Sequence, residues 1–446
     1  MTKKASLKIL FAAIVGCFSS GEAVAAAGEV KAEGFFEADS DFGASLPADK
    51  IYPMGSEFLF TFFSIGGGTP DDMEAFFPEE EYQAYLKEFK DAGFTVIGPG
   101  YELDPRLLQD AEDHDMKLLY SVGLQMNFHS KEPRVLSSEE IKEQVGEQVK
   151  AVADNDRIAI WYLKPEELRH WRKNEMEYLK AATEAIREND PQGRPIWFYE
   201  PNHRSAKSLS ATSQYTDVIG KGMYTNGAGK HHERVWNRWS MDQEKLAEET
   251  IGRDLLVLSM PGMYRQPAEE DLELIPAWVT YDVFGSMVDG AEGIVVFSLR
   301  RRPNFDAVDQ YYDTYKELAP IVLGEDGLGQ VFLFGVDRDD LAVDIVSGPE
   351  TAVLESYRGA RVTEPIEYPS ITIANKVYKG KRYVVLVNSA NESIDAVLSG
   401  LPYMQIEVDE LLDDAESYRV FEGDIHLTLP PYGVKIYEMA PADASL

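Results

Sequence analysis

The chain has 446 residues, of which 43 are Lys or Arg and 77 are Asp or Glu, so its formal net charge is −34. This acidity disfavours nucleic-acid binding, because a protein that replaces phosphate counterions needs a basic footprint. The single cysteine excludes a disulfide framework and a zinc site built from cysteines. Hydrophobic residues make up 44% of the chain, which excludes a wholly disordered protein and allows a large core.

The first residues have the layout of an export signal. Three lysines within the first eight residues precede an apolar run over 9–16, and small residues follow. Two processing routes fit: cleavage after Ala25, which makes residues 1–25 a signal peptide, or lipidation of Cys17 within the lipobox-like Ile14-Val15-Gly16-Cys17. The sequence therefore predicts an exported protein that is secreted, periplasmic or a surface lipoprotein.

The segment over residues 26–50 is rich in Ala, Glu, Asp and Gly and is predicted to be a flexible leader. No later segment supplies the ~20 uninterrupted apolar residues that a membrane span needs.

From residue 57 onward, apolar runs of strand length alternate with segments of helical periodicity, the pattern of βαβ units and a parallel sheet. Eight strands are predicted: Phe58–Ile65, Phe94–Gly98, Lys117–Gly123, Ile158–Leu163, Pro195–Tyr199, Asp217–Tyr224, Asp254–Met260 and Gly293–Ser298. Helices are predicted over Glu79–Ala92, Ser137–Ala153, Lys173–Glu188, Glu233–Glu249, Asp271–Val288 and Asp306–Val322.

Eight strand–helix units within residues 51–325 match the ~250 residues of a (β/α)8 TIM barrel, so the predicted fold class is α/β. A doubly wound open sheet is the alternative. Against it, Gly66-Gly67-Gly68 follows the first strand but lacks the remaining spacing of a phosphate-binding loop.

Residues 326–446 form a second unit, in which short alternating runs are separated by turn residues. Strands are predicted over Ile371–Tyr378, Arg382–Val387, Asp395–Leu398 and Val434–Met439. This pattern predicts a small all-β domain, most simply an antiparallel sandwich.

Two parts of the sequence resemble exported barrel glycoside hydrolases of the cellulase and β-galactosidase-like superfamily. The runs over 382–389 and 429–437, with the turn Asn391-Glu392-Ser393 between them, resemble the C-terminal β-sandwich of many such enzymes. The stretch over 278–298, with Gly290-Ala291-Glu292-Gly293 before its last strand, resembles their seventh helix and eighth strand. The resemblance implies a sugar-cleaving barrel with an accessory domain.

Candidate catalytic carboxylates follow the fourth strand. In a TIM barrel the reactive groups lie at the C-terminal ends of the strands. There, Trp161-Tyr162-Leu163-Lys164-Pro165-Glu166-Glu167 resembles the fourth-strand end of retaining glycosidases, in which a Glu is the acid/base. Pro and Glu stand where those families usually have Asn, so either Glu167 or Glu166 fits this role. Acids here would also suit the first turn of a helix.

The second carboxylate has several candidates. The resemblance places a nucleophile at the end of the seventh strand, but residues 258–263 contain no acid. Glu200 follows the aromatic run Trp197-Phe198-Tyr199 at the end of the fifth strand and is the preferred candidate. Glu102 and the pair Glu269-Glu270 are further candidates. In such enzymes one carboxyl must stay protonated while the other is ionised, and the separation between the two decides retention or inversion.

Cations gather near the predicted mouth of the barrel. Residues 201–240 contain six Lys or Arg against two acids, together with three of the seven His residues. Lys164 and the run Arg300-Arg301-Arg302 add to them. This distribution favours an anionic ligand, because guanidinium and ammonium groups pair with sulfate or carboxylate oxygens. Neutralisation of neighbouring acids is the simpler explanation.

Aromatic rings near the strand ends favour a sugar, whose C–H faces stack on them. The predicted substrate-binding set combines these rings with the cations and their neighbours: Trp161, Tyr162, Lys164, Tyr199, Asn202, His203, Arg204, Lys221, Tyr224, His231, His232, Tyr264, Arg300 and Arg301. No cofactor is predicted. No metal site is predicted either, since the adjacent His231 and His232 lack a metal-binding spacing.

The leading prediction is therefore a glycoside hydrolase that cleaves an anionic, sulfated or uronate-containing, polysaccharide or oligosaccharide with two carboxylates. One alternative is a polysaccharide lyase, with Tyr224, His203 or Lys221 as the base and Arg300 or Arg204 neutralising the uronate. The other is a barrel that binds a glycan without cleaving it.

Overall fold

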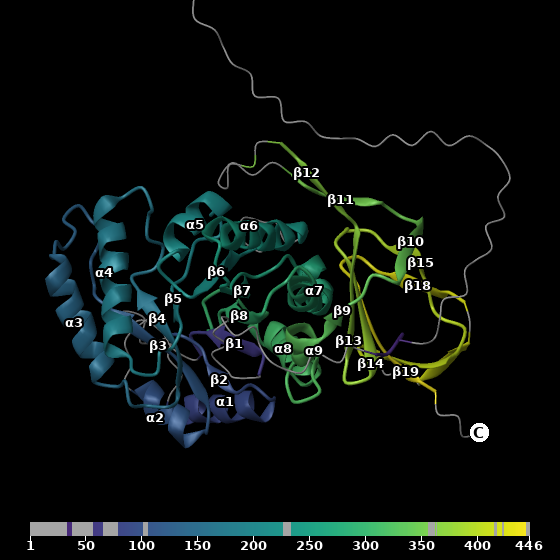
Figure 1. Ribbon diagram of the computed structural model, residues 1–446, viewed down its shortest axis with the longest axis horizontal. Coiled ribbons are helices and arrows are strands. Elements are labelled where there is room, and N and C mark those ends of the chain that lie inside the picture. Colours follow the sequence, from purple (N-terminus) through teal and green to yellow (C-terminus); the bar gives the residue numbers. More distant parts are fainter. Residues whose placement is uncertain are drawn as a thin grey trace, which may run out of the picture.

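The computed structural model describes residues 34–37, 57–65, 79–100, 106–225, 233–355, 362, 364–413, 417–421 and 423–442. Within them, a helix-covered barrel lies beside a C-terminal domain of antiparallel sheets (Figure 1). The predicted signal segment with Cys17 and the triplet Gly66-Gly67-Gly68 lie outside the described residues.

Eight strands build the barrel: β1 (Leu59–Phe63), β2 (Val96–Ile97), β3 (Lys117–Gly123), β4 (Ile158–Lys164), β5 (Ile196–Trp197), β6 (Val218–Met223), β7 (Leu256–Pro261) and β8 (Gly293–Phe297). All of their pairings are parallel, within two four-stranded sheets of order β2-β3-β4-β5 and β1-β8-β7-β6. Each lies within a residue or two of a strand predicted from the sequence, which confirms the predicted α/β barrel.

Sparse contacts join the two sheets into a closed barrel. Between β5 and β6, a single parallel bridge links Glu200 to Lys221. Between β1 and β2, the amide of Ser64 donates to the carbonyl of Pro99 at 2.9 Å. The hydroxyl of Thr61 also donates to the carbonyl of Val96 at 2.6 Å.

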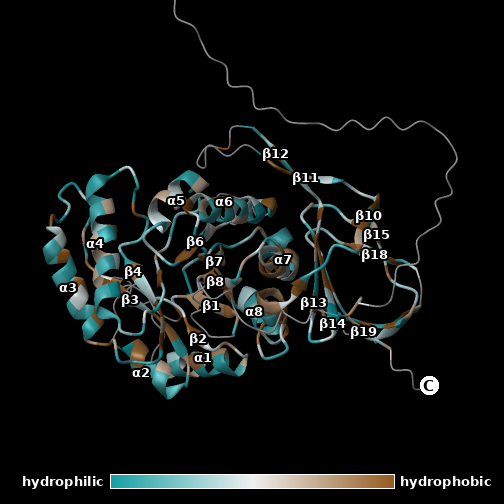
Figure 2. Cartoon of the chain, viewed as in Figure 1, coloured by the Kyte–Doolittle hydropathy of each residue, from teal (hydrophilic) through white to brown (hydrophobic). Residues whose placement is uncertain are grey.

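Both faces of the barrel strands are buried, which explains their continuous apolar sequences. One cluster of side chains fills the interior: Leu59, Phe63, Val96, Leu119, Ile160, Tyr162, Trp197, Val218, Leu258 and Val295. The outward residues of the same strands pack against the helices, whose inner sides are apolar (Figure 2).

The surrounding helices are α1 (Glu79–Asp91), α2 (Arg106–Asp113), α3 (Ser138–Lys150), α4 (Lys173–Asn189), α5 (Ala206–Ser213), α6 (Val235–Ile251), α7 (Ile275–Val288), α8 (Val308–Val322) and α9 (Leu328–Phe334). A 3-10 helix, η3 (Glu269–Leu274), leads into α7. The six predicted helices are confirmed, whereas α2, α5 and α9 were not predicted. In the described part of the chain, no helix has the length and apolar character to span a bilayer.

The C-terminal domain is a sandwich of antiparallel sheets. Its strands are β9 (Val336–Asp337), β10 (Ala342–Ser347), β11 (Thr351–Leu354), β12 (Ile366–Pro369), β13 (Ile371–Tyr378), β14 (Lys381–Asn388), β15 (Ile394–Ser399), β16 (Gln405–Glu410), β17 (Tyr418–Phe421), β18 (Ile425–Leu429) and β19 (Val434–Pro441). A six-stranded sheet, β17-β16-β19-β14-β13-β9, faces the three-stranded sheet β10-β15-β18, and apolar side chains from both sheets form one core between them.

Residues 34–37 differ from the flexible leader expected over 26–50. Phe35 is buried in the core of the C-terminal domain, and the guanidinium of Arg382 lies 3.8 Å from the centre of its ring. An aromatic ring that finds an apolar surface orders the backbone around it, even within a polar segment.

The outer face of the six-stranded sheet packs against α7. Tyr383, Val385 and Val387 from β14 belong to the same core as the residues of α7. The Tyr281 hydroxyl on α7 donates to Oγ of Ser389 at 3.0 Å, and the ring of Tyr281 packs edge-on against that of Tyr432. A continuous core therefore joins barrel and sandwich.

Candidate active site

An aromatic floor lies at the C-terminal ends of the barrel strands. Phe63 at the end of β1 packs against Tyr162 of β4 at 5.6 Å and Phe297 of β8 at 5.3 Å between ring centres. Tyr224, just after β6, packs against Phe297 at 5.2 Å and Tyr264 at 5.1 Å. We call this end of the barrel the mouth, and these rings together with Tyr199 its floor.

Glycine at position 222 makes room for two of these rings. A Cβ there would lie 2.7 Å from the ring of Tyr224 and 2.9 Å from the hydroxyl of Tyr199. Tyr199 and Tyr224 stack nearly parallel, with 6.3 Å between their ring centres. Burial raises the pKa of the Tyr199 phenol, so its hydroxyl stays protonated and is unsuited to act as a base.

Glu166 points into the mouth. The Tyr162 hydroxyl donates to its carboxyl at 2.8 Å. Burial raises the pKa of Glu166 and the charge of Glu167 adds to this, whereas Lys164 and the hydrogen bond from Tyr162 act in the opposite direction. Desolvation is the largest effect, and it favours the protonated carboxyl that a general acid requires.

Glu167 lies beside Glu166 in a different backbone conformation. Its φ of 59° is left-handed, and its amide donates to the carbonyl of Tyr199 at 3.1 Å. Its charge raises the pKa of Glu166, of Tyr199 and of the buried Glu200. The structure thus brings two carboxyl groups and the aromatic floor together.

The structure places Glu200 outside the mouth, in contrast to the sequence prediction. The residue is buried, and its side chain lies between β5 and α5, where it accepts hydrogen bonds from Arg204 at 3.1 Å and from Thr212. Burial raises the pKa of Glu200 to about 7, although Arg204 opposes the shift. It is a buried anchor for Arg204, whose Nη2 donates to the carbonyl of Leu168 at 2.9 Å.

Trp161 also faces away from the mouth. Successive side chains of a strand point to opposite faces, so Tyr162 and Trp161 cannot both face the interior. The indole of Trp161 donates to Asp190 at 2.8 Å and carries the guanidinium of Arg194 at 4.7 Å from its ring centre, both on the helix side of β4.

Lys221 and Asn202 lie behind the mouth. Lys221 is fully buried on the outer side of β6, where its ammonium lies 4.4 Å from the ring centre of Trp239 and donates to the carbonyl of Asn202 at 2.8 Å. Desolvation lowers the pKa of Lys221 to about 7. The Asn202 side chain accepts hydrogen bonds from the Tyr224 amide at 3.2 Å and from Trp236, so it supports the floor from behind.

The three arginines after β8 take different positions. Arg302, which the predicted set omitted, lies 5.7 Å from the ring centre of Phe297 and 5.9 Å from that of Tyr264. Arg300 is half-buried beside it, whereas Arg301 pairs with Asp309 at 2.8 Å on the outer surface near α8. Because the three arginines are consecutive in a loop, the sequence has no periodicity that could have shown which of them faces the mouth.

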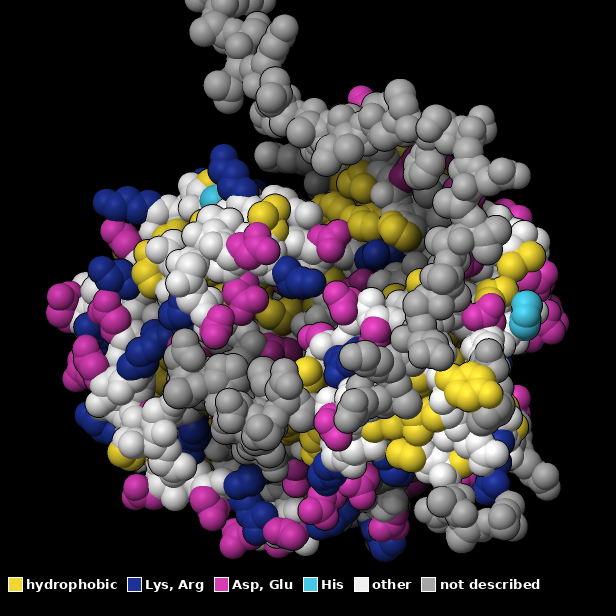
Figure 3. All heavy atoms as spheres, turned by 45° about the vertical axis from the view of Figure 1, so that its right-hand side comes forward, with side chains coloured by type: hydrophobic (Ala, Val, Ile, Leu, Met, Phe, Trp, Pro, Cys, Tyr) yellow, Lys and Arg dark blue, Asp and Glu magenta, His cyan; other side chains and the backbone are white. Residues whose placement is uncertain are grey.

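The remaining predicted cations divide between the mouth and other environments. Lys164, at the end of β4, acts electrostatically on Glu166, and His203 is exposed at the rim. His231, His232 and Glu102 lie outside the described residues. On the face of the barrel that Figure 3 shows, basic and acidic side chains are interspersed. No group of three His, Cys, Asp or Glu side chains in the described ranges is arranged to hold a metal ion.

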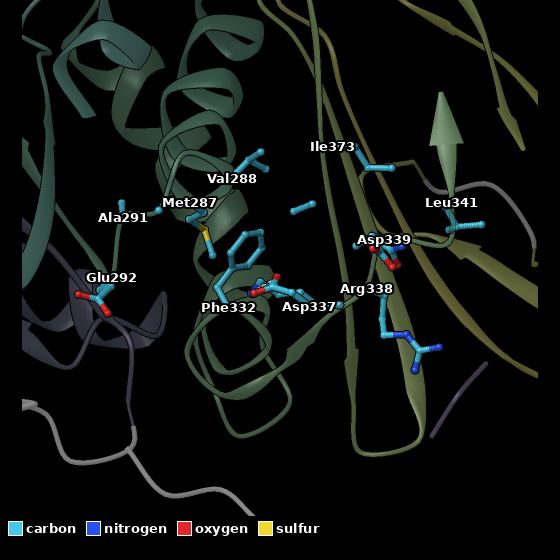
Figure 4. Close-up of a pocket in the computed structure, with 14 residues that line it drawn as sticks. Met287, Val288, Ala291, Glu292, Phe332, Asp337, Arg338, Asp339, Leu341 and Ile373 are labelled. Atoms are coloured by element: carbon cyan, nitrogen blue, oxygen red, sulfur yellow. Dashed lines mark hydrogen bonds and ion pairs between the residues drawn. The ribbon is translucent and has the colours of Figure 1, made fainter. Parts of the chain in front are cut away.

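A hollow of about 580 Å³ lies between the two domains, beside α7 and the segment that leads into the sandwich (Figure 4). Phe332, Asp337 and Arg338 line it. It adjoins the turn before β8, at the end of the barrel opposite to Glu166, and its Lys376 and Asp337 pair at 2.7 Å. The reactive end of a TIM barrel is the other one, so this hollow is not the candidate active site.

The architecture, a TIM barrel followed by an antiparallel sandwich, is one found among solved glycoside hydrolases. An α-amylase from Geobacillus thermoleovorans, solved with acarbose, aligns at 12% identity and a TM-score of 0.50, over 87% of this chain and 99% of its own. An Anoxybacillus α-amylase aligns at 12% identity and a TM-score of 0.51, over 87% of this chain and 99% of its own. A structure titled "Glycoside hydrolase" aligns at 10% identity and a TM-score of 0.55, over 87% of this chain and 93% of its own.

These likenesses show a shared fold. No family model and no curated protein matches the chain.

Proposed function

We propose that the protein is a glycoside hydrolase that acts on an anionic carbohydrate, with Glu166 as the proton donor and Glu167 as the ionised partner carboxylate. The observation that carries the proposal is Glu166 itself. It is a carboxyl with a pKa raised by burial, at the C-terminal end of a barrel strand and above an aromatic floor. The fold shared with solved glycoside hydrolases supports it.

The mechanism needs two carboxyl groups in different protonation states. Glu166 donates its proton to the glycosidic oxygen as the bond to the anomeric carbon breaks, and the sugar ring develops positive charge. The carboxylate of Glu167 stabilises that charge. A water molecule then adds to the anomeric carbon and gives up a proton, which restores the acid form of Glu166. The preference for an anionic sugar is supported by Lys164 and Arg302 at the mouth, which suit sulfate or carboxylate oxygens.

The test is a screen of the purified chain against sulfated galactans, fucans, ulvan, alginate and neutral polysaccharides, with reducing ends and ultraviolet absorbance measured together. We expect new reducing ends on an anionic substrate without absorbance from an unsaturated product. Ultraviolet absorbance from an unsaturated product would show that the enzyme is a lyase and not a hydrolase. Saturable binding without either signal would leave a glycan-binding barrel.

Variants then separate the two carboxyls. We expect Glu166→Gln to lower kcat by about 100-fold or more, within the range for a lost general acid. The loss should be small on an aryl glycoside whose leaving group needs no protonation, whereas Glu167→Gln should be inactive on both substrates. Glu249→Gln, exposed at the far end of α6, is the control. Full activity of both mouth variants would overturn the assignment.

A further inference from the structure

We propose that Trp171 is an accessory sugar-binding platform on the rim of the mouth, which holds a second anionic unit of a chain bound at Glu166. This inference rests on the proposed function and extends it from one sugar to a longer carbohydrate. It concerns the loop over residues 165–172, which connects β4 to α4 and carries both candidate carboxylates.

Trp171 differs from every other tryptophan of the chain. Its side chain is 57% exposed, while the other five are buried. A large ring left in water forgoes the stabilisation that burial of its apolar surface would give, and its free face is one on which the C–H groups of a sugar can stack. Because its loop follows β4, Trp171 lies at the same end of the barrel as Glu166.

The indole is held in place from below and from the side. The guanidinium of Arg204 lies 5.1 Å from its ring centre, and the ring of His170 meets it edge-on at 5.0 Å. Arg204 is itself buried and fixed by its ion pair with Glu200 at 3.1 Å. The buried Arg204 and the partly buried His170 thus support an exposed ring, an arrangement that the packing of the core does not require.

A second buried glutamate fixes the same loop. Glu175, 1% exposed at the start of α4, accepts the backbone amide of Arg169 at 2.6 Å and its Nε at 2.8 Å. The Arg169 side chain also donates to the carbonyl of Phe128 at 2.9 Å. Glu175 and Glu200 together hold the loop at two points, so a ligand that stacks on Trp171 meets a preorganised surface.

Cations beside Trp171 indicate the chemistry of its ligand. Arg172 and Lys173 are exposed, and Lys173 is 3.5 Å from the exposed Glu177. Within the described part of the chain, Arg172 forms no ion pair. In a protein of net charge −34, an exposed indole followed in the chain by two exposed cations suits a sugar that offers a C–H face to the ring and a sulfate or carboxylate to the cations.

The first test is binding, in the full chain with Glu166→Gln so that no probe is cleaved. Calorimetric titrations use carrageenan oligosaccharides, which carry sulfate, alginate oligosaccharides, which carry carboxylate, and neutral agarose oligosaccharides. We expect an anionic probe to bind, and Trp171→Ala to raise its Kd about tenfold, a change of about 1.4 kcal/mol. Trp171→Phe should restore most of the affinity, and Arg172→Ala should weaken only the anionic probe.

The exposed Tyr403 of the C-terminal domain provides the control, since Tyr403→Ala removes an exposed ring far from the mouth and should leave Kd unchanged. An unchanged Kd for Trp171→Ala, or a parent that binds neither anionic probe, would overturn the platform. The probe that responds identifies the anion as sulfate or carboxylate.

The second test is kinetic and separates this inference from the proposed function. Trp171→Ala should raise KM for a polymer and leave kcat/KM for a monosaccharide aryl glycoside unchanged, because only the polymer reaches the rim. If binding depends on Trp171 but no substrate is hydrolysed, only the proposed hydrolase activity is contradicted. If a substrate is hydrolysed but its binding does not depend on Trp171, only the sugar-binding role of Trp171 is contradicted.

Discussion

At the residue scale, the environment of Glu166 decides whether it serves as an acid. Burial favours its protonated form, and Lys164 favours the ionised one. These opposing effects place the ionisation of Glu166 under the control of a neighbour that is itself only half-buried. The balance can therefore be changed without altering the carboxyl.

Replacing Lys164 by Met should move the alkaline limb of the activity profile to higher pH. The cation lowers the pKa of Glu166, so its removal raises that pKa, and the acid form required for catalysis persists to higher pH. The measurement is kcat/KM against pH. Lys164→Arg keeps the positive charge, so its alkaline limb should lie at the same pH as that of the unmodified protein. A limb that moves to lower pH in Lys164→Met would contradict the role of Glu166.

The sequence identified the mouth but not which side chains face it. Glu166, Glu167, Tyr162, Tyr199, Tyr224, Tyr264 and Lys164 were predicted and lie there. Trp161, Glu200 and Lys221 lie on the outer faces of the same strands. In a barrel both faces of a strand are buried, so the alternation of polar and apolar residues that would reveal the inward side disappears. Trp171 lies in a loop, where the sequence shows no alternation of polar and apolar residues. Its exposure therefore became visible only in the folded structure.

At the element scale, strands and long helices were predictable because their signals are long. Continuous apolar runs marked the eight strands, and 13 to 17 residues of helical periodicity marked helices such as α1 and α4. The eight-residue helices α2 and α5 were missed, because two turns carry too few apolar positions to establish a period. Tertiary packing stabilises such short helices.

The start of α3 offers a test of local sequence signals. Ser137 accepts the amide of Glu140, whose carboxylate accepts the amide of Ser137 at 2.8 Å, a complete capping box. We expect Ser137→Ala to lower the free energy of unfolding by about 1 kcal/mol, measured by urea denaturation. Ser205 occupies the same position in α5 without a side-chain cap hydrogen bond, so Ser205→Ala should have a smaller effect. Equal losses in the two variants would refute this account.

At the scale of the whole molecule, one core runs from the barrel into the sandwich. Tyr432 is fully buried in it, next to Tyr281 of α7. All six tryptophans lie between residues 161 and 278, in the barrel, and two of them, Trp236 and Trp239, pack against residues of the C-terminal domain such as Leu354 and Ile394. Tryptophan fluorescence therefore reports on the barrel and on its interface with that domain. The midpoint of the fluorescence transition, rather than its amplitude, then measures the stability of the barrel.

Tyr432→Ala should therefore destabilise the barrel as well as the sandwich. Truncation of a large buried ring costs about 3–5 kcal/mol, and the cavity would lie in the shared core. We expect the fluorescence and circular dichroism transitions to shift together to lower denaturant. Tyr403→Ala is the control, because its ring is exposed. A fluorescence transition that stays at the parent midpoint would show that the two domains unfold independently.

The sparse pairing between β5 and β6 has a consequence for how the protein meets its ligand. Tyr162, Glu166 and Tyr199 belong to the half made of β2 to β5, while Phe63, Tyr224 and Phe297 belong to the half made of β6 to β1. A sugar that rests on this floor touches both halves at once. Because it binds the folded barrel and not the unfolded chain, such a ligand stabilises both halves together, in addition to the backbone contacts that join them.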